Sequence, residues 1–298
     1  MDKLLFIYNP HAGKGRVRLR LAELLNAFTR VGQVVTAYPT QGPGDAVQAA
    51  RQLAPHYDRL VVCGGDGTLH EVVNGLMALP MEHRPVVGYI PAGTTNDFAQ
   101  NLSLPRKMDA KAALAATGAA RRVDVGRLEE DYFVYVAAFG AFTSVAYDTP
   151  QQFKNVLGHL AYVLRGITEL ANIKGYHLKL THDDGELEGE FLYGMVSNTV
   201  SVGGLIGLPA EEVALDDGEL EVLLIPMPKT MADLNAMIRG LATQTYSKET
   251  GIIGFHTARL TMECDEPLPF TLDGENGGQH TLSHITACHQ AIPIVFGS

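Results

Sequence analysis

The sequence predicts an α/β domain with a parallel sheet, followed by an antiparallel β-sandwich domain. Three observations support this fold class. The chain has 298 residues, and a domain typically takes roughly 100–200. Up to about residue 122, short apolar runs alternate with amphipathic segments of helical period. From Val123 onward, apolar and polar residues alternate with period two between Gly, Asp and Pro, as in antiparallel strands.

The first domain is expected to begin with a buried strand, because residues 3–8 (KLLFIY) are apolar and a turn follows at once. Residues 16–31 then predict a helix that carries Leu21, Leu24 and Phe28 on one face. Further strands are expected over 33–38, 58–63 and 86–90, helices over 45–54 and 68–78, and a helical turn over 95–102. Strands that alternate with helices predict a parallel sheet covered on both faces.

The second domain is expected to begin near residue 124 without a linker, which gives domains of 1–123 and 124–286. Two stretches of helical spacing, 156–173 and about 230–246, interrupt its strands. The first carries an apolar stripe, for which we favour burial against the sheet over contact with a lipid. Strands are predicted over 132–140, 177–182, 186–199, 218–226, 258–264, 268–275 and 280–289.

The composition excludes several classes of protein. Hydrophobic residues make up 46% of the chain, enough to bury a core, so a disordered chain is excluded. The net charge of −10 argues against a nucleic-acid partner, because phosphate contacts need a basic surface. Three cysteines without paired spacing predict a reducing, cytoplasmic environment. The sequence contains no run of about 18 apolar residues, so no transmembrane segment is predicted.

The charge is unevenly spread along the chain. Residues 1–30 hold six basic and two acidic side chains, a local charge of +4, whereas residues 183–221 hold eleven acidic side chains and no Lys or Arg. The acidic total therefore does not forbid phosphate chemistry in the first domain. It predicts strong Mg²⁺ dependence, and access to a membrane through a local patch rather than through overall charge.

The strongest functional signal is the run Gly64-Gly65-Asp66-Gly67-Thr68, which lies between a predicted strand and a predicted helix. Glycines let the backbone approach a ligand, and a helix N-terminus favours an anion, so a phosphate is the expected ligand. Asp66 would repel a bare phosphate, and we interpret it as a residue that holds Mg²⁺ or orients groups through water. The alternative is a capped glycine turn without a ligand.

Two further loops of small residues, 9–15 and 91–97, also follow predicted strands. The carboxyl ends of parallel strands share one edge of a sheet, where ligands bind. Three such loops at one edge favour a function over three structural turns. The first is not a Walker loop, because Gly13-Lys14-Gly15 lacks the following Ser or Thr.

Five ordered motifs together resemble a known family. They are Asn9-Pro-x-x-Gly13, Gly64-Gly-Asp-Gly-Thr-Leu-x-Glu71, Pro91-x-Gly-Thr-x-Asn-Asp-Phe98, Leu215-Asp-Asp-Gly218 and Leu272-Asp-Gly-Glu275. Over essentially its whole length the chain resembles the diacylglycerol kinase catalytic-domain family, in particular the soluble bacterial diacylglycerol kinases and related lipid kinases.

The resemblance implies an ATP-binding α/β domain, a β-sandwich domain for the lipid, and an active site in the cleft between them. It also implies that residues 287–298 return to the first domain. The expected reaction phosphorylates the free hydroxyl of diacylglycerol with ATP, giving phosphatidic acid. Nucleotide contacts carry over to Asn9, Pro10, His11, Ala12, Gly13, Thr40, Gly65, Asp66, Gly67, Thr68, Leu69, His70, Glu71 and Thr94.

The resemblance also implies which residues carry the chemistry. Glu275 matches the family's general base, and Asp66 would act with Mg²⁺ at the phosphates. A structural Mg²⁺ site falls on the Asp217 side chain and on the carbonyls of Ala214 and Glu219. Both assignments agree with physical chemistry. Hard oxygen ligands suit Mg²⁺, and a carboxylate aimed at a hydroxyl can accept its proton during phosphoryl transfer.

The sequence departs from the family's usual pattern at His70, Gln100 and Ala214, where Asn, Arg and Lys are common. The first two departures bear on nucleotide contacts and on the choice of substrate. A kinase for another hydroxyl lipid, such as phosphatidylglycerol or a sphingoid base, therefore stays open. So do a NAD kinase, which shares the glycine loop, and a catalytically silent nucleotide- or lipid-binding module.

We expect a cytoplasmic protein that meets its lipid substrate at a membrane surface by peripheral association. A homodimer is expected from the resemblance alone. His284, Cys288 and His289 match no metal-ligand spacing, and we interpret them as strand residues rather than as a metal site.

Overall fold

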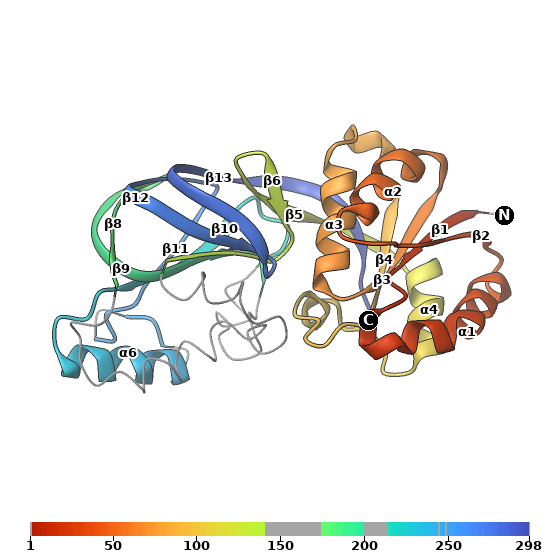
Figure 1. Cartoon of the computed structure of the whole chain (residues 1–298), viewed down its shortest axis with the longest axis horizontal. Helices are drawn as coiled ribbons and strands as arrows, with labels where there is room; N and C mark the ends of the chain where they lie inside the picture. The colour runs from red at the N-terminus through yellow and green to blue at the C-terminus, as the bar shows by residue number, and fades with distance from the viewer. Residues whose placement is uncertain (1, 141–173, 200–213, 244, 248, 298) are drawn as a thin grey trace. The chain divides into compact units, whose positions relative to one another are not determined.

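The computed structural model describes residues 2–140, 174–199, 214–243, 245–247 and 249–297 (Figure 1). The helix expected over 156–173, with its apolar stripe, lies outside these residues. The chain divides into two compact units. The first comprises Met1–Val123 and Gln290–Ser298, and the second comprises Asp124–His289.

A parallel sheet forms the centre of the first unit. Its strands, in spatial order, are β2 (Val34–Pro39), β1 (Lys3–Tyr8), β3 (Arg59–Gly64), β4 (Val86–Pro91) and the end of β13 (Glu275–Val295). The four strands predicted in this region are confirmed, and so is their parallel arrangement. The fifth comes from the far end of the chain, where Ile294 pairs with Val87.

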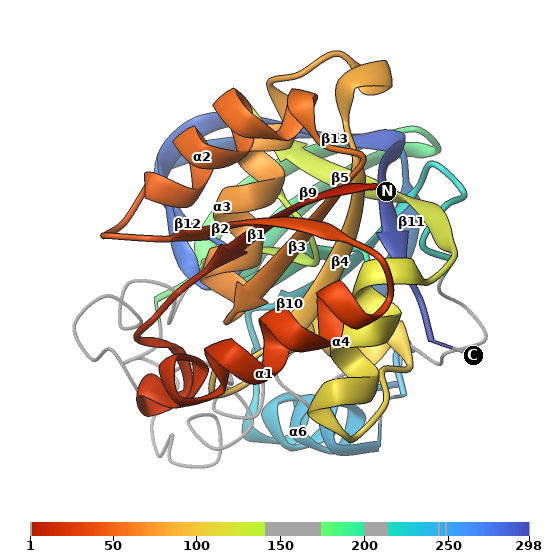
Figure 2. The same ribbon diagram turned by 90° about the vertical axis from the view of Figure 1, so that its right-hand side faces the viewer.

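Helices cover both faces of this sheet (Figure 2). Helices α2 (Asp45–Leu53) and α3 (Asp66–Met77) pack together on one face, and α1 (Arg16–Arg30) and α4 (Met108–Thr117) pack together on the other. The sheet is therefore buried on both sides, which explains the near-continuous apolar runs of its strands. On the α1 side, Phe28 meets Phe6 edge-on at a ring-centroid distance of 5.1 Å.

Helix α4 is the one regular helix in the described part of the first unit that was not predicted from the sequence. It buries Ala112, Ala115 and Ala116, and its close approach to β4 needs Gly88, where a Cβ would clash with the Ala115 carbonyl. An alanine face lacks the large apolar side chains that reveal a helix by their spacing. Short 3₁₀ turns complete the unit: η1 (Ala12–Gly15), η2 (Ala54–His56), η3 (Met81–His83) and η4 (Phe98–Leu102).

The second unit is built from antiparallel strands, as the sequence predicts. The long strands β9 (Gly185–Ser197) and β12 (Arg259–Leu272) pair with β8 (Tyr176–His182) through their first halves and with β7 (Val136–Gly140) through their second halves. The sheet thus curves around a core that includes Phe139, Val222 and Phe270 (Figure 1). Its elements are β5 (Ala120–Leu128, which begins in the first unit), β6 (Asp131–Phe133), β7 (Val136–Gly140), β8 (Tyr176–His182), β9 (Gly185–Ser197), β10 (Leu220–Pro226), α6 (Met231–Thr243), β11 (Ile253–Thr257), β12 (Arg259–Leu272) and most of β13.

Candidate active site

Three glycine-bearing loops meet at the carboxyl edge of the parallel sheet in the first unit. They follow β1, β3 and β4. Asn9 donates its N–H to the Cys63 carbonyl at 2.9 Å, which joins the first loop to the end of β3. Ala92 donates its N–H to the Gly64 carbonyl at 2.7 Å, which joins the third loop to the second. The structure therefore brings together three loops that lie far apart in the sequence, since the first of these bonds spans 54 residues and the second spans 28.

The loops touch through their backbones, and this contact requires glycine. A Cβ on Gly13 would lie 2.7 Å from the Ala92 carbonyl oxygen, and one on Gly93 would lie 2.5 Å from the Cα of Gly65. Any larger residue at these positions would push the loops apart. Loops in direct backbone contact can direct main-chain N–H groups from more than one strand end at a single anion.

The first loop is a shaped turn that leads into α1. Asn9 Oδ1 accepts the N–H of His11 at 2.8 Å. Gly13, Lys14 and Gly15 follow in left-handed conformation, with φ of 60°, 59° and 79°. This conformation is natural for glycine and unusual for lysine. The predicted contact residues Asn9–Gly13 therefore lie in a turn that directly precedes α1, which begins at Arg16.

The second loop opens α3 with a carboxylate. Asp66 is only 7% exposed and Asp97 only 2%, and Asp66 Oδ2 accepts the N–H of Asp97 at 3.2 Å. Burial first, and then the negative charges of Asp66 and Asp97, raise the pKa of Tyr89. Tyr89 therefore stays protonated and donates its O–H to the Gly64 carbonyl at 3.3 Å. Asp97 lies within the motif of residues 91–98 but is not among the predicted site residues.

The third loop is closed by the side chain of Asn96. Its Oδ1 accepts the N–H of Gly93 at 2.7 Å, and its Nδ2 donates to the carbonyl of Gly93 at 3.0 Å. This ring leaves Thr94 exposed at the tip of the loop. On α3, Leu69 is buried in the core and can offer a ligand only its main chain, whereas His70 is half-buried beside Asn74.

Two further predicted nucleotide residues lie near this edge. Thr40 is 8% exposed and donates its N–H to the Tyr8 carbonyl at 2.9 Å, directly beside the start of the first loop. Glu71 is on α3, and its carboxylate accepts the N–H groups of Gly44 and Ala46 at 2.8 and 3.0 Å. The side chain of Glu71 is therefore bound to the start of α2.

In the second unit, Glu275 follows a tight hairpin turn between β12 and β13. Asp273 and Gly274 form the turn with φ of 52° and 84°, as expected for an Asp-Gly hairpin. The Asp273 carboxylate is buried and accepts the N–H groups of Val134, Tyr135 and Val136 at 2.7, 3.0 and 3.1 Å. This anchor fixes the turn, and Glu275 is presented to solvent at its end.

The predicted metal turn also lies in the second unit. Asp124 Oδ2 accepts the N–H of Gly218 at 2.6 Å, and Asp217 Oδ1 accepts the N–H of Glu219 at 3.0 Å. Glu221 is only 2% exposed, and its Oε2 has no hydrogen-bond partner among the described residues. Burial, together with the negative charges of Asp217 and Asp124, raises the pKa of Glu221 to about 8.

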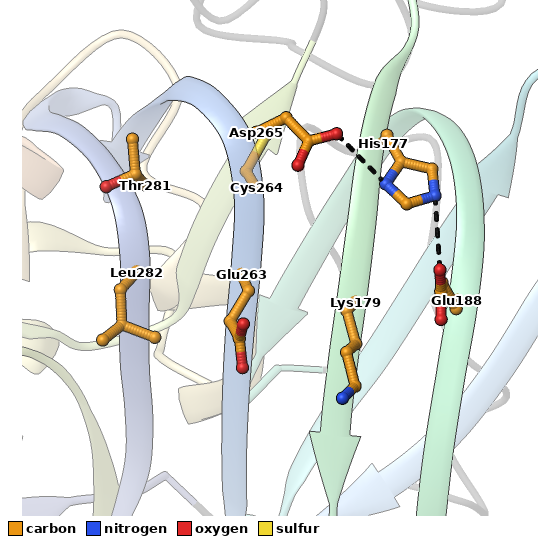
Figure 3. Close-up of a pocket in the computed structure, with 8 residues that line it drawn as sticks. All are labelled: His177, Lys179, Glu188, Glu263, Cys264, Asp265, Thr281 and Leu282. Carbon is orange, nitrogen blue, oxygen red and sulfur yellow. Dashed lines mark ion pairs between the residues drawn. The ribbon is translucent and has the colours of Figure 1, made fainter.

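A separate hollow of about 640 Å³ lies on the second unit, and Figure 3 shows its lining. His177 stands between Asp265 and Glu188, with Nδ1–Oδ2 and Nε2–Oε1 distances of 3.4 and 3.6 Å. None of the predicted site residues lines it. The lining residues are His177, Lys179, Glu188, Glu263, Cys264, Asp265, Thr281 and Leu282.

Comparison with known proteins connects both units to one family. Residues 3–128 match the diacylglycerol kinase catalytic domain, and residues 136–296 match the YegS C-terminal NAD kinase beta sandwich-like domain. A diacylglycerol kinase of Bacillus subtilis (strain 168) is 34% identical over 280 residues, which cover 93% of this chain and 91% of the relative. The chain belongs to the diacylglycerol kinase catalytic-domain family.

Further proteins similar to this kinase are also named diacylglycerol kinases. A diacylglycerol kinase of Staphylococcus aureus (strain MRSA252) is 32% identical over 92% of this chain and 86% of its own. A crystal structure of a diacylglycerol kinase from Bacillus anthracis str. Sterne matches with a TM-score of 0.80 at 26% identity, covering 99% of this chain and 97% of that one. The resemblance and the fold class inferred from the sequence are confirmed. No helix within the described ranges is long and apolar enough to cross a membrane.

The hairpin anchor of the kinase can be tested by stability. Asp273→Ala leaves three buried N–H groups without their acceptor, so we expect the free energy of unfolding to fall by about 3 kcal/mol. Glu275→Gln, two residues away and exposed, should change it by less than about 0.5 kcal/mol. Urea unfolding followed by circular dichroism measures both. An Asp273→Ala variant as stable as the wild type would show that the anchor is not needed.

Proposed function

We propose that this kinase transfers the γ-phosphate of ATP to the free hydroxyl of diacylglycerol, giving phosphatidic acid. The observation that carries the proposal is the backbone contact of the three glycine loops at one sheet edge, an arrangement suited to a polyphosphate. The relatives named diacylglycerol kinase, at 32–34% identity over more than nine-tenths of this chain, support diacylglycerol as the acceptor.

The proposed reaction is a displacement at the γ-phosphorus. The lipid hydroxyl oxygen forms a bond to this phosphorus, the bond to the oxygen bridging to the β-phosphorus breaks, and ADP leaves with that oxygen. Glu275 would accept the hydroxyl proton. Two features support this role for Glu275: it is a carboxylate exposed to solvent, and it lies on a turn that the Asp273 carboxylate anchors. Proton transfer is needed only as the new bond forms, so a carboxylate aimed at the hydroxyl can act as the base.

Mg²⁺ would have two places in this proposal. At the phosphates, Asp66 would hold or orient the ion, and burial beside Asp97 gives it a fixed position at the start of α3. At the metal turn, the donors are oxygens of Asp217 and of the main chain, which fit a hard cation. The Oε2 of Glu221, which has no hydrogen-bond partner among the described residues, would be a further oxygen near this turn, but with a pKa of about 8 it is mostly protonated at neutral pH. No three His, Cys, Asp or Glu side chains of the described residues gather as a metal site, so main-chain carbonyls would complete the coordination.

The substrate and the base can be tested together. Wild-type protein, Mg²⁺ and radiolabelled ATP should phosphorylate dioleoylglycerol in mixed micelles, and Glu275→Gln should lose most of the turnover, by about 100-fold or more, because no base accepts the proton. ATP binding should persist. Glu263→Gln, an exposed carboxylate of β12, is the matched control and should keep full activity.

Three outcomes of that assay would contradict the proposal. Phosphorylation of phosphatidylglycerol or a sphingoid base, with none of dioleoylglycerol, would reassign the substrate. Phosphorylation of NAD alone would reassign the enzyme. Near-normal turnover by Glu275→Gln would remove Glu275 as the base.

The metal turn can be tested without nucleotide or lipid. Mg²⁺ that binds only the folded protein should raise the midpoint of thermal unfolding by several degrees, because binding shifts the equilibrium toward the folded state. Asp217→Asn should abolish most of this rise, whereas Glu186→Gln, an exposed carboxylate of β9, should retain it. An Asp217→Asn variant that responds to Mg²⁺ like the wild type would place the ion elsewhere.

A further inference from the structure

The start of α2 is held by α3 through Glu71. Gly44, the residue before α2, has no side chain to cap the helix and lies in left-handed conformation. The first N–H groups of a helix need acceptors. Glu71, on α3, provides two acceptors here. Its Oε1 accepts the N–H of Gly44 at 2.8 Å, and its Oε2 accepts the N–H of Ala46 at 3.0 Å. A carboxylate is also favoured there by the helix dipole.

Gly75 strengthens the same junction one turn further along α3. Residues four apart lie on one face of a helix, so Glu71 and Gly75 both face α2. A Cβ on Gly75 would clash with the Val47 carbonyl and lie 2.8 Å from the Cβ of Ala50. The two helices therefore meet through their backbones, and the start of α2 has a fixed position relative to α3. The first residue of α3 is Asp66, in the glycine loop.

Residues 40–46, which connect β2 to α2 and include the first two residues of α2, form a segment held together by hydrogen bonds. Asp45 Oδ2 accepts the N–H of Gln41 at 2.7 Å, and Asp45 Oδ1 accepts the O–H of Tyr38 at 2.8 Å. Thr40 begins the segment and is held on the other side by its 2.9 Å hydrogen bond to Tyr8. The position of Thr40 thus depends on β1 at one end and on Glu71 at the other.

We propose that Glu71 is a positioning residue, which acts on the nucleotide by fixing segment 40–46 and with it Thr40, rather than by touching the nucleotide. Both carboxylate oxygens are already bound to main-chain N–H groups. A carboxylate would also repel a triphosphate at close range. Helix α3 therefore ties the Thr40 segment to the glycine loop, so that two parts of the site keep one geometry. This inference rests on the proposed nucleotide site.

The test measures the affinity for Mg²⁺·ADP by titration calorimetry. Glu71→Gln keeps the size of the side chain, but its amide can accept only one of the two N–H groups. We expect its Kd to rise about tenfold, as for the loss of one charged hydrogen bond. Thr40→Ala should also weaken binding, and the double variant should bind no more weakly than Thr40→Ala alone. Glu82→Gln, an exposed carboxylate of the same unit, should bind like the wild type.

Hydrogen exchange gives a second readout that does not depend on nucleotide. The amides of residues 41–46 should exchange faster in Glu71→Gln, while those of β1 keep their protection. Glu71→Asp, shorter by one methylene, serves as a second variant if Glu71→Gln does not fold.

Three results would overturn the inference. One is an unchanged Kd for Glu71→Gln. Another is an effect of Glu71→Gln that is undiminished in the Thr40→Ala background, since this would mean direct contact with the nucleotide. A wild-type protein that binds no Mg²⁺·ADP would overturn the proposed nucleotide site together with this inference, whereas the first two results leave that site standing.

Discussion

The first unit depends on backbone contact between loops that follow different strands. Gly13 lies against Ala92, and Gly93 lies against Gly65, at distances that leave no room for a side chain. These contacts hold the three loops at the carboxyl edge of the sheet in one fixed arrangement. The hydrogen bonds of Asn9 and Ala92 to neighbouring strand ends hold the loops in register. An anion-binding site made of main-chain N–H groups needs this arrangement, because the backbone cannot move toward a ligand as a side chain can.

Carboxylates complete the architecture as acceptors for main-chain N–H groups. Glu71 and Asp45 hold the start of α2, Asp124 holds the turn at Gly218 that is predicted to bind a metal, and Asp273 holds the hairpin that presents Glu275. Several negative charges of this acidic chain therefore have structural partners inside the molecule. The net charge of −10 is compatible with phosphate chemistry because part of it belongs to such anchors and part to the second unit.

Most strands and helices of the first unit could be predicted from the sequence. Apolar runs indicate the buried strands of a parallel sheet, and apolar residues at helical spacing indicate the helices that cover it. Helix α4 was missed because its buried face is alanine. Asp273 was missed as an anchor because an acidic residue in a turn usually faces solvent, and only the fold shows which N–H groups surround it. The motifs identified Glu71, but its bond to α2 depends on how two helices pack, which no local pattern encodes.

The backbone contact at Gly93 offers the most direct test of this account. Gly93→Ala adds one methyl group where the Cα of Gly65 lies 2.5 Å away. Titration calorimetry with Mg²⁺·ADP should show affinity weakened by about tenfold or more, because the loops must separate. Gly189→Ala, where the nearest atom is 3.7 Å away, is the control and should bind normally. Wild-type affinity in a folded Gly93→Ala variant would contradict the claim that contact between the loops forms the nucleotide site.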